Sequence, residues 1–258
     1  MTDRQESAKA FSDMHVPGSP LVLFNAWDAG SARAVSAAGA AAIATGSWSV
    51  AAAHGYGDGE KLPLDLAIAN LARIVDAVDI PVSVDIESGY DDPAATAKQM
   101  VAAGAIGCNV EDSFAADGTL REVADQAERV AAMRRVLDAA SPGFFINART
   151  DIFFQAPIED HDGKMVKAAL DRAARYTDAG SDGIFVPGVV DLALIEQLVA
   201  GTTAPINIMM SDASPSLRQL ADVGVARISY GPAPYLAVMR QLEAEAATVI
   251  GWKGSQPD

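Results

Sequence analysis

The sequence feature that most constrains the fold is a regular alternation of short apolar runs with alanine-rich segments. Each run is about four or five residues long, is almost free of charge, and is bounded by Gly, Pro or Asp. This pattern is typical of parallel strands that are buried on both faces. The eight runs are Leu21–Phe24, Ala42–Thr45, Pro81–Val84, Ile106–Val110, Phe144–Asn147, Gly183–Val186, Pro205–Ile208 and Ala226–Ser229.

The segments between the runs have the periodicity of amphipathic helices. In residues 67–78, one stripe carries Ile68, Leu71, Ile74, Val75 and Val78, which is the spacing of a helix with one buried face. Several segments end at a glycine, which accepts the left-handed conformation of a helix C-cap. These glycines are Gly39, Gly104, Gly180 and Gly224.

About eight strand–helix pairs in succession predict an α/β fold, namely a closed (β/α)₈ TIM-type barrel. A doubly wound open sheet is the alternative. No linker or change of composition divides the chain, so residues 1–258 are expected to form a single domain. The segment Ser7–His15 is predicted to form an extra N-terminal helix that covers the bottom of the barrel, with His15 itself at the surface.

Composition excludes several classes of partner. The chain has 34 acidic and 19 basic residues and a formal charge of −15, whereas nucleic-acid binding needs clusters of Lys and Arg. Apolar runs such as Ala37–Ala44 are far shorter than the roughly 20 residues of a membrane-spanning helix. The polar start, Met1–Glu6, lacks the apolar core of a signal peptide, so a cytoplasmic location is expected. A single cysteine, Cys108, excludes an intramolecular disulfide.

Acidic residues collect where the predicted strands end, which is where barrel enzymes carry their chemistry. Five of them follow the second, third and fourth runs: Asp58, Asp85, Glu87, Glu111 and Asp112. Strand alternation in Asp85-Ile86-Glu87 predicts that both carboxylates point into the barrel. Carboxylates this close repel one another, and a divalent cation relieves the repulsion. The sequence therefore predicts a Mg²⁺ site at Asp85 and Glu87, with Mn²⁺ as the other possible ion.

Two further features predict binding of an anionic substrate. Arg149 follows the fifth run, and its planar guanidinium matches a carboxylate. The turn Thr45-Gly46-Ser47 contains a glycine that allows backbone N–H groups to approach an anion. Trp48 beside this turn either walls the pocket or packs in the core. Asn207, in the seventh run, is a further candidate for substrate binding.

Each charged residue also has a structural interpretation. Asp58 can belong to a turn with Gly59, and Arg149 can form an ion pair with Asp151. Asp112 can cap the next segment, and Asp28 can cap the helix that follows it. The functional interpretation is favoured because acidic residues follow three successive predicted strands and so gather at one end of the barrel, which helix capping does not explain.

Six segments together resemble the isocitrate lyase/phosphoenolpyruvate mutase superfamily. The resemblance extends from about Leu21 to Gly231. It implies a β/α barrel, a homodimer or homotetramer with an exchanged C-terminal helix, and a Mg²⁺ site that binds 2-oxo or 2-hydroxy carboxylates. The segments are Asn25–Arg33, Thr45–Ser47, Gly55–Gly59, Asp85–Tyr90, Val110–Asp112 and Ile146–Asp151.

The resemblance also implies a role for individual residues. Asp85 matches the principal Mg²⁺ ligand, and Glu87 stands where many members have a second Asp. The turn from Thr45 to Ser47 matches the segment that binds the carboxylate and oxo groups of the substrate. The catalytic candidates are Asp58 and Glu111, which match further acidic groups around the metal, and Arg149, which matches the arginine that contacts the substrate.

The loop Ser113–Leu120 departs from the superfamily pattern. It has no Cys, Lys or His, so it lacks both the cysteine loop of the lyases and the Glu-Asp-Lys motif of the mutases. Members of the superfamily that are similar to oxaloacetate decarboxylase act without that cysteine. The leading hypothesis is therefore a Mg²⁺-dependent lyase that cleaves a C–C bond of a small 2-oxo or 2-hydroxy di- or tricarboxylate, as oxaloacetate decarboxylase or methylisocitrate lyase does. The alternatives are P–C chemistry of the phosphoenolpyruvate mutase or phosphonopyruvate hydrolase type, and a non-catalytic 2-oxoacid binder.

Overall fold

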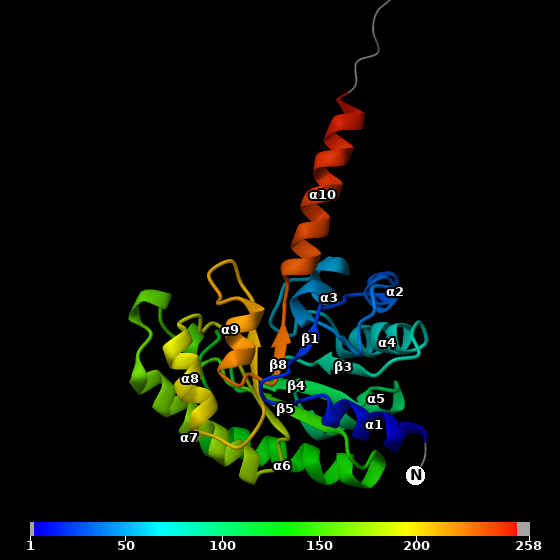
Figure 1. The fold of residues 1–258 in the computed structure, drawn as a ribbon. Helices are drawn as coiled ribbons and strands as arrows, with labels where there is room; N and C mark the ends of the chain where they lie inside the picture. Colours follow the sequence, from blue (N-terminus) through cyan, green and yellow to red (C-terminus); the bar gives the residue numbers. More distant parts are fainter. Residues whose placement is uncertain (1–2, 252–258) are drawn as a thin grey trace, which may run out of the picture.

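Eight parallel strands form the barrel predicted from the sequence (Figure 1). The computed structural model describes residues 3–251. The sheet has the order β1-β8-β7-β6-β5-β4-β3-β2, and a parallel bridge between Ala26 and Thr45 links the chain beyond β1 to the chain beyond β2. The strands are β1 Leu21–Leu23, β2 Ile43–Ala44, β3 Val82–Asp85, β4 Gly107–Glu111, β5 Phe145–Arg149, β6 Gly183–Val186, β7 Ile206–Met209 and β8 Arg227–Ser229.

Helices follow the strands and surround the sheet (Figure 1). Two helices, α3 and α4, lie between β2 and β3, and short 3₁₀ helices at Ile152–Phe154 and Ile158–Asp160 follow β5. The α-helices are α1 Asp3–Asp13, α2 Ala29–Ala37, α3 Ser47–Ala53, α4 Leu64–Val75, α5 Pro93–Ala102, α6 Val123–Ala140, α7 Gly163–Asp178, α8 Leu192–Ala200, α9 Leu217–Asp222 and α10 Ala233–Ile250.

Local sequence signals set the helix ends. The Asp28 side chain accepts a hydrogen bond from the Ser31 amide at the start of α2, so the predicted N-cap is confirmed. The four glycines predicted to end helices all have positive φ, between 92° and 105°. At Gly104 a side chain is also sterically excluded, because a Cβ there would lie 2.7 Å from Val75 Cγ1.

Helix α1 packs across the amino-terminal end of the barrel, as predicted, although it ends at Asp13. Its Phe11 ring makes an edge contact with Phe145 of β5, at 5.7 Å between ring centroids. The expectation that His15 lies at the surface is wrong, because its ring stacks on Phe145 at 4.0 Å and is 7% exposed. Burial and the charge of Arg227 lower the pKa of His15 to about 3.

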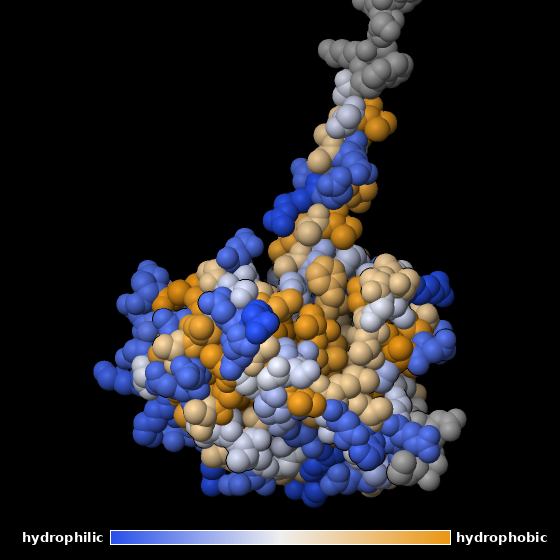
Figure 2. All heavy atoms as spheres, in the orientation of Figure 1, coloured by the Kyte–Doolittle hydropathy of each residue, from blue (hydrophilic) through white to orange (hydrophobic). Residues whose placement is uncertain are grey.

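Helix α10 projects away from the barrel (Figure 1). Apolar side chains along it are exposed, with exposed fractions that rise from 37% at Leu236 to 84% at Ile250. Figure 2 shows these hydrophobic side chains along the projecting helix. Within residues 3–251, no helix combines the length and the apolar character needed to cross a membrane.

Candidate active site

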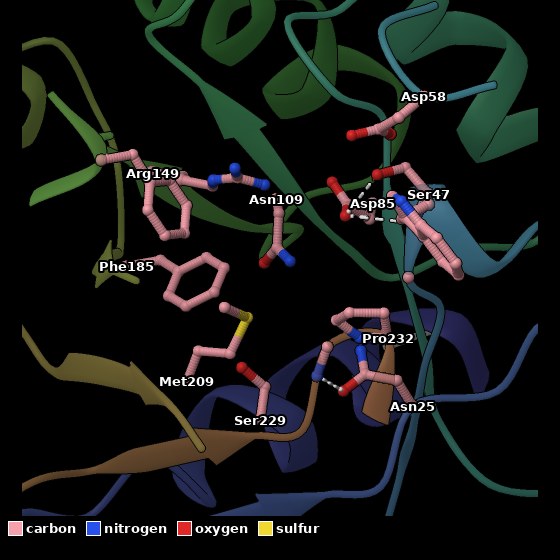
Figure 3. A pocket seen from close by; sticks show the side chains of 14 residues that line it. Asn25, Ser47, Asp58, Asp85, Asn109, Arg149, Phe185, Met209, Ser229 and Pro232 are labelled. Atoms are coloured by element: carbon pink, nitrogen blue, oxygen red, sulfur yellow. Dashed lines mark hydrogen bonds between the residues drawn. The ribbon is translucent and has the colours of Figure 1, made fainter. Parts of the chain in front are cut away.

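A cavity of about 180 Å³ opens at the carboxyl ends of the strands (Figure 3). Residues from all eight strands and the loops that follow them line it, so distant parts of the sequence meet here. The lining residues are Asn25, Gly46, Ser47, Trp48, Asp58, Asp85, Asn109, Arg149, Phe154, Phe185, Met209, Ser229, Gly231 and Pro232.

The structure brings most of the predicted site residues to this cavity. Gly46, Ser47, Trp48, Asp58, Asp85 and Arg149 line it. The other predicted residues lie behind the lining, where they contact side chains or backbone that do reach the cavity. These are Thr45, Glu87, Glu111 and Asn207.

Asp85 is the last residue of β3, and the turn after β2 holds its carboxylate in place. Asp85 Oδ2 accepts hydrogen bonds from the backbone N–H of Ser47 at 3.2 Å and from Ser47 Oγ at 2.9 Å. The backbone N–H of Asp85 donates to Thr45 Oγ1 at 2.9 Å. The turn therefore binds an anion, as its glycine suggested, but in this structure that anion is Asp85.

Asp58 lies next to Asp85 on the same side of the cavity (Figure 3). Burial raises the pKa of Asp58, and the negative charge of Asp85 raises it further. Among residues 3–251, no three His, Cys, Asp or Glu side chains converge as a set of metal ligands. Mg²⁺ takes only one or two carboxylates directly and completes its shell with water and substrate oxygens, so the Asp58–Asp85 pair fits this ion.

The expectation that Glu87 points into the barrel beside Asp85 is wrong. Strand β3 ends at Asp85, and Glu87 has a φ of 55°, so strand alternation no longer determines its direction. Its carboxylate accepts a hydrogen bond from the backbone N–H of Glu60, and the residue is 4% exposed. Burial raises the pKa of Glu87 to about 7.

Glu60, which the sequence did not indicate, joins the two acidic loops. Its Oε1 accepts hydrogen bonds from Ser88 Oγ and from the backbone N–H of Tyr90, both at 2.7 Å. Glu60, Glu87 and Tyr90 all have φ values between 55° and 59°, in the left-handed region that is unfavourable for side chains of this size. These bonds hold the loop that carries Asp58 against the loop that follows Asp85.

Arg149, on the opposite side of the cavity, is held by two carboxylates. Its Nη1 lies 2.8 Å from Glu111 Oε2, and its Nε and Nη2 donate to Asp151 at 2.6 and 3.0 Å. The predicted ion pair with Asp151 is thus confirmed. Burial opposes the charge of Arg149, but Glu111 and Asp151 raise its pKa, so the guanidinium stays charged. Three of its five N–H groups are occupied, which leaves two for a ligand.

Glu111 supports Arg149 from the neighbouring strand. The two residues are register partners on β4 and β5. Ser113 Oγ donates to Glu111 Oε1 at 2.8 Å and lies 2.9 Å from Asp151 Oδ2, so the three groups around Arg149 are linked. Burial raises the pKa of Glu111, although the charge of Arg149 opposes this shift. Glu111 does not line the cavity and contacts Arg149 from behind, so its predicted catalytic role stays a prediction.

Comparison with known proteins identifies the family. The sequence model described as phosphoenolpyruvate phosphomutase matches residues 11–250. The chain belongs to this family. A solved structure from Burkholderia cenocepacia, which carries a provisional phosphonomutase name, is similar at a TM-score of 0.92 and 50% identity. That similarity covers 96% of this chain and 100% of the other.

Two curated relatives have different reactions in their names. The 2-methylisocitrate lyase of Salmonella typhimurium is 29% identical over 96% of this chain and 86% of its own. The oxaloacetate decarboxylase of Ectopseudomonas mendocina is 28% identical over 72% of this chain and 64% of its own. The chain is thus an enzyme of the isocitrate lyase/phosphoenolpyruvate mutase superfamily, as its motifs predicted.

In this family member the loop after β4 does not reach the cavity. Residues 113–120 fold back on themselves, with an antiparallel bridge between Ser113 and Leu120, and none of them lines the cavity. Phe114 is 40% exposed and lies against the Arg121 guanidinium at 4.2 Å. The departure from the superfamily motifs therefore coincides with a loop that contributes no side chain to the lining.

Other lining residues were not predicted as a site. Asn25 Oδ1 accepts hydrogen bonds from the backbone N–H groups of Tyr230 and Gly231, at 2.9 and 3.0 Å, and thereby joins the ends of β1 and β8 (Figure 3). Phe185 and Met209 form an apolar wall opposite Asp85 (Figure 3). Their position at strand ends is visible in the sequence, but apolar side chains there do not stand out from the core.

Proposed function

We propose that this enzyme cleaves a C–C bond of a small 2-oxo or 2-hydroxy di- or tricarboxylate and depends on Mg²⁺, with Mn²⁺ as a substitute. The observation that carries the proposal is that the same cavity is lined by Asp58 and Asp85 on one side and by Arg149 on the other. Two adjacent carboxylates suit a divalent cation, and a fixed guanidinium suits a carboxylate.

Asp85 would hold the metal, with Asp58 beside it. When bound, Mg²⁺ supplies positive charge that polarises the oxo group and stabilises charge formed during cleavage. Arg149 would use its two remaining N–H groups to orient the substrate carboxylate, while Glu111 and Asp151 keep the guanidinium in place. Gly46, Ser47 and Trp48 would form the wall on the metal side. Substrate contact by Thr45 and Asn207, and a metal contact by Glu87, stay predictions.

The experiment that tests the proposal is an assay of substrates with and without Mg²⁺. The panel contains oxaloacetate, 2-methylisocitrate, 2,3-dimethylmalate and phosphonopyruvate, each in EDTA, in Mg²⁺ and in Mn²⁺. We expect turnover of at least one C–C substrate in either metal and none in EDTA. Turnover that is unaffected by EDTA would overturn the metal assignment.

P–C chemistry is the second candidate, because the matching family model has a phosphomutase description. The loop Ser113–Leu120 contains no Lys to assist at the phosphonate. Turnover of phosphonopyruvate, with none of the three C–C substrates, would reverse the ranking. Tight Mg²⁺-dependent oxalate binding without turnover of any panel member would instead favour a non-catalytic 2-oxoacid binder.

We also propose that two copies of the chain exchange helix α10, in a homodimer or within a homotetramer. The outer face of β1 is uncovered, with Val22 39% and Phe24 47% exposed, and it forms an apolar groove with α2. Helix α10 carries exposed apolar side chains and projects away from this groove (Figures 1 and 2). Sedimentation equilibrium should show an oligomer that dissociates when the chain is cut after Pro232. A monomeric full-length chain would exclude the exchange.

A cytoplasmic location remains part of the proposal.

A further inference from the structure

A buried arginine lies inside the barrel, beneath the cavity. Arg227 of β8 is 1% exposed and stands two residues before Ser229, which lines the cavity. Its guanidinium lies 6.0 Å from the ring of Phe11 at the bottom of the barrel. Within residues 3–251 it forms no ion pair, and its Nε and Nη1 have no hydrogen-bond partner. Burial of a charge without an ion-pair partner is unfavourable, and the more distant charge of Asp85 only partly offsets it, so a function for Arg227 is expected.

Among residues 3–251, the Arg227 side chain makes one hydrogen bond, and its partner is a residue that reaches the cavity. Its Nη2 donates to Asn109 Oδ1 at 3.1 Å, across 118 positions in the sequence. Asn147 Nδ2 donates to the same oxygen at 2.9 Å. Asn109 itself is on β4, and its side chain stands among the residues that line the cavity (Figure 3).

Arg227 determines which way the Asn109 amide faces. The oxygen and nitrogen of an asparagine amide can exchange places by a half turn of the side chain. A guanidinium only donates hydrogen bonds, so the Asn109 oxygen must face Arg227 and the Nδ2 group must face away from it. This Nδ2 has no hydrogen-bond partner among the described residues, and it is not fully buried.

The charge of Arg227 also strengthens Asn109 as a donor. Burial lowers the pKa of Arg227 to about 10, which leaves the guanidinium charged at neutral pH. A cation that binds the amide oxygen polarises the amide and makes its N–H groups better donors in an interior of low dielectric. Arg227 would therefore fix both the direction and the strength of the hydrogen bond that the Asn109 Nδ2 group donates to an acceptor in the cavity.

We propose that Asn109 is a substrate-binding residue whose Nδ2 group donates to an oxygen of the bound carboxylate, and that Arg227 is the residue that positions it. The inference rests on the proposed function, since it takes the ligand to be a 2-oxo carboxylate or its analogue. The Asn109 amide would be an uncharged hydrogen-bond donor beside the charged groups that line the cavity.

The test measures oxalate binding by calorimetry in saturating Mg²⁺, together with the melting temperature. Asn109→Leu removes the donor, and we expect about tenfold weaker binding, which corresponds to the loss of one hydrogen bond. Asn109→Asp keeps the shape and gives Arg227 a counter-charge. It should weaken oxalate binding by about a hundredfold through charge repulsion while raising the melting temperature. Oxalate affinity within twofold of wild type in both variants would overturn the inference.

Arg227 variants separate positioning from a purely structural role. Arg227→Met removes an unpaired buried charge, so the melting temperature should hold or rise while oxalate binding weakens about fivefold. Arg227→Lys retains a charged donor and should restore most of the affinity. The matched control is Arg134→Met on α6, which breaks ion pairs with Asp138 and Asp182. It should lower the melting temperature without changing oxalate affinity.

The outcomes distinguish this inference from the proposed function. If the wild-type enzyme shows no Mg²⁺-dependent oxalate binding, the proposed function fails and the inference falls with it. If the wild type binds oxalate and Arg227→Met lowers the melting temperature at unchanged affinity, Arg227 is structural and only the inference is wrong.

Discussion

The two ends of the barrel contain buried ionisable groups in opposite situations. At the carboxyl ends of the strands, Asp58, Asp85 and Glu87 are crowded together, and burial raises the pKa of both Asp58 and Glu87. At the amino-terminal end, aromatic rings from α1 and β5 enclose His15, and its pKa falls. The first end keeps acidic side chains close together beside a cavity, whereas at the second end helix α1 packs aromatic rings around the ionisable group. This difference predicts that substitutions at the two ends separate activity from stability.

The largest effect is expected from Asp85→Asn at the carboxyl end. Loss of the charge should remove Mg²⁺ binding and lower kcat/KM by about a thousandfold, as expected when a metal's charge stabilisation is lost. The melting temperature in EDTA should hold or rise, because the repulsion with Asp58 is relieved. The measurements are steady-state kinetics against Mg²⁺ concentration and thermal unfolding. Asp65→Asn, at an exposed position of α4, is the control.

The opposite result is expected from Phe11→Ala at the amino-terminal end. Phe11 is fully buried against His15 and Phe145, so its truncation should lower the free energy of unfolding by about 3–4 kcal/mol. The kcat/KM of the folded fraction should be unchanged. Urea unfolding and kinetics at low temperature measure the two quantities, with the exposed Phe114→Ala as control. A large loss of activity in the folded fraction would show that the two ends are not independent.

The acids at the carboxyl end should make stability fall as pH rises. The pKa of Glu87 is raised from 4.5 to about 7, so the folded chain binds the proton more tightly than the unfolded chain. The stability is present below pH 4.5 and is lost as pH rises towards 7, by about 2 kcal/mol between pH 5 and 7. Urea unfolding in EDTA should show this loss reduced in Glu87→Gln and retained in the exposed variant Glu128→Gln.

His15 should give the smallest effect, with the opposite sign. Its pKa is lowered from 6.5 to about 3, so the unfolded chain binds the proton more tightly. Stability is therefore present above pH 6.5 and falls as the pH drops, by about 1 kcal/mol between pH 6.5 and 5.5. His15→Phe keeps the stacking on Phe145 and should remove this pH dependence of stability. Equal pH dependence of the wild type and the variant over that range would contradict the burial of His15.

Much of the site could be predicted because its residues lie at the ends of strands that the sequence marks clearly. Asp85 and Arg149 come within two residues after two apolar runs, and parallel strands bring such ends to one rim. Asp58 was predicted from its place in the loop after the second run and from the superfamily resemblance, and the structure places it at the cavity beside Asp85. The ion pair of Arg149 with Asp151 was also visible, since the two residues are two positions apart.

The direction of Glu87 could not be predicted from alternation. The positive φ of Glu87 and its bond to the Glu60 amide form only when two loops 27 residues apart are brought together. The same holds for the burial of His15, which depends on a ring of β5 far along the chain. In each case a contact between residues that are far apart in the sequence overrides what the neighbouring residues predict.

The sequence by itself determined that this chain forms a (β/α)₈ barrel and that acids gather at one end, because period and strand ends are local properties of the chain. The tertiary structure decided which of those acids face the cavity and which support other residues. It also placed Arg227 beneath Asn109, since that pairing depends on how strands far apart in the sequence meet across the barrel interior.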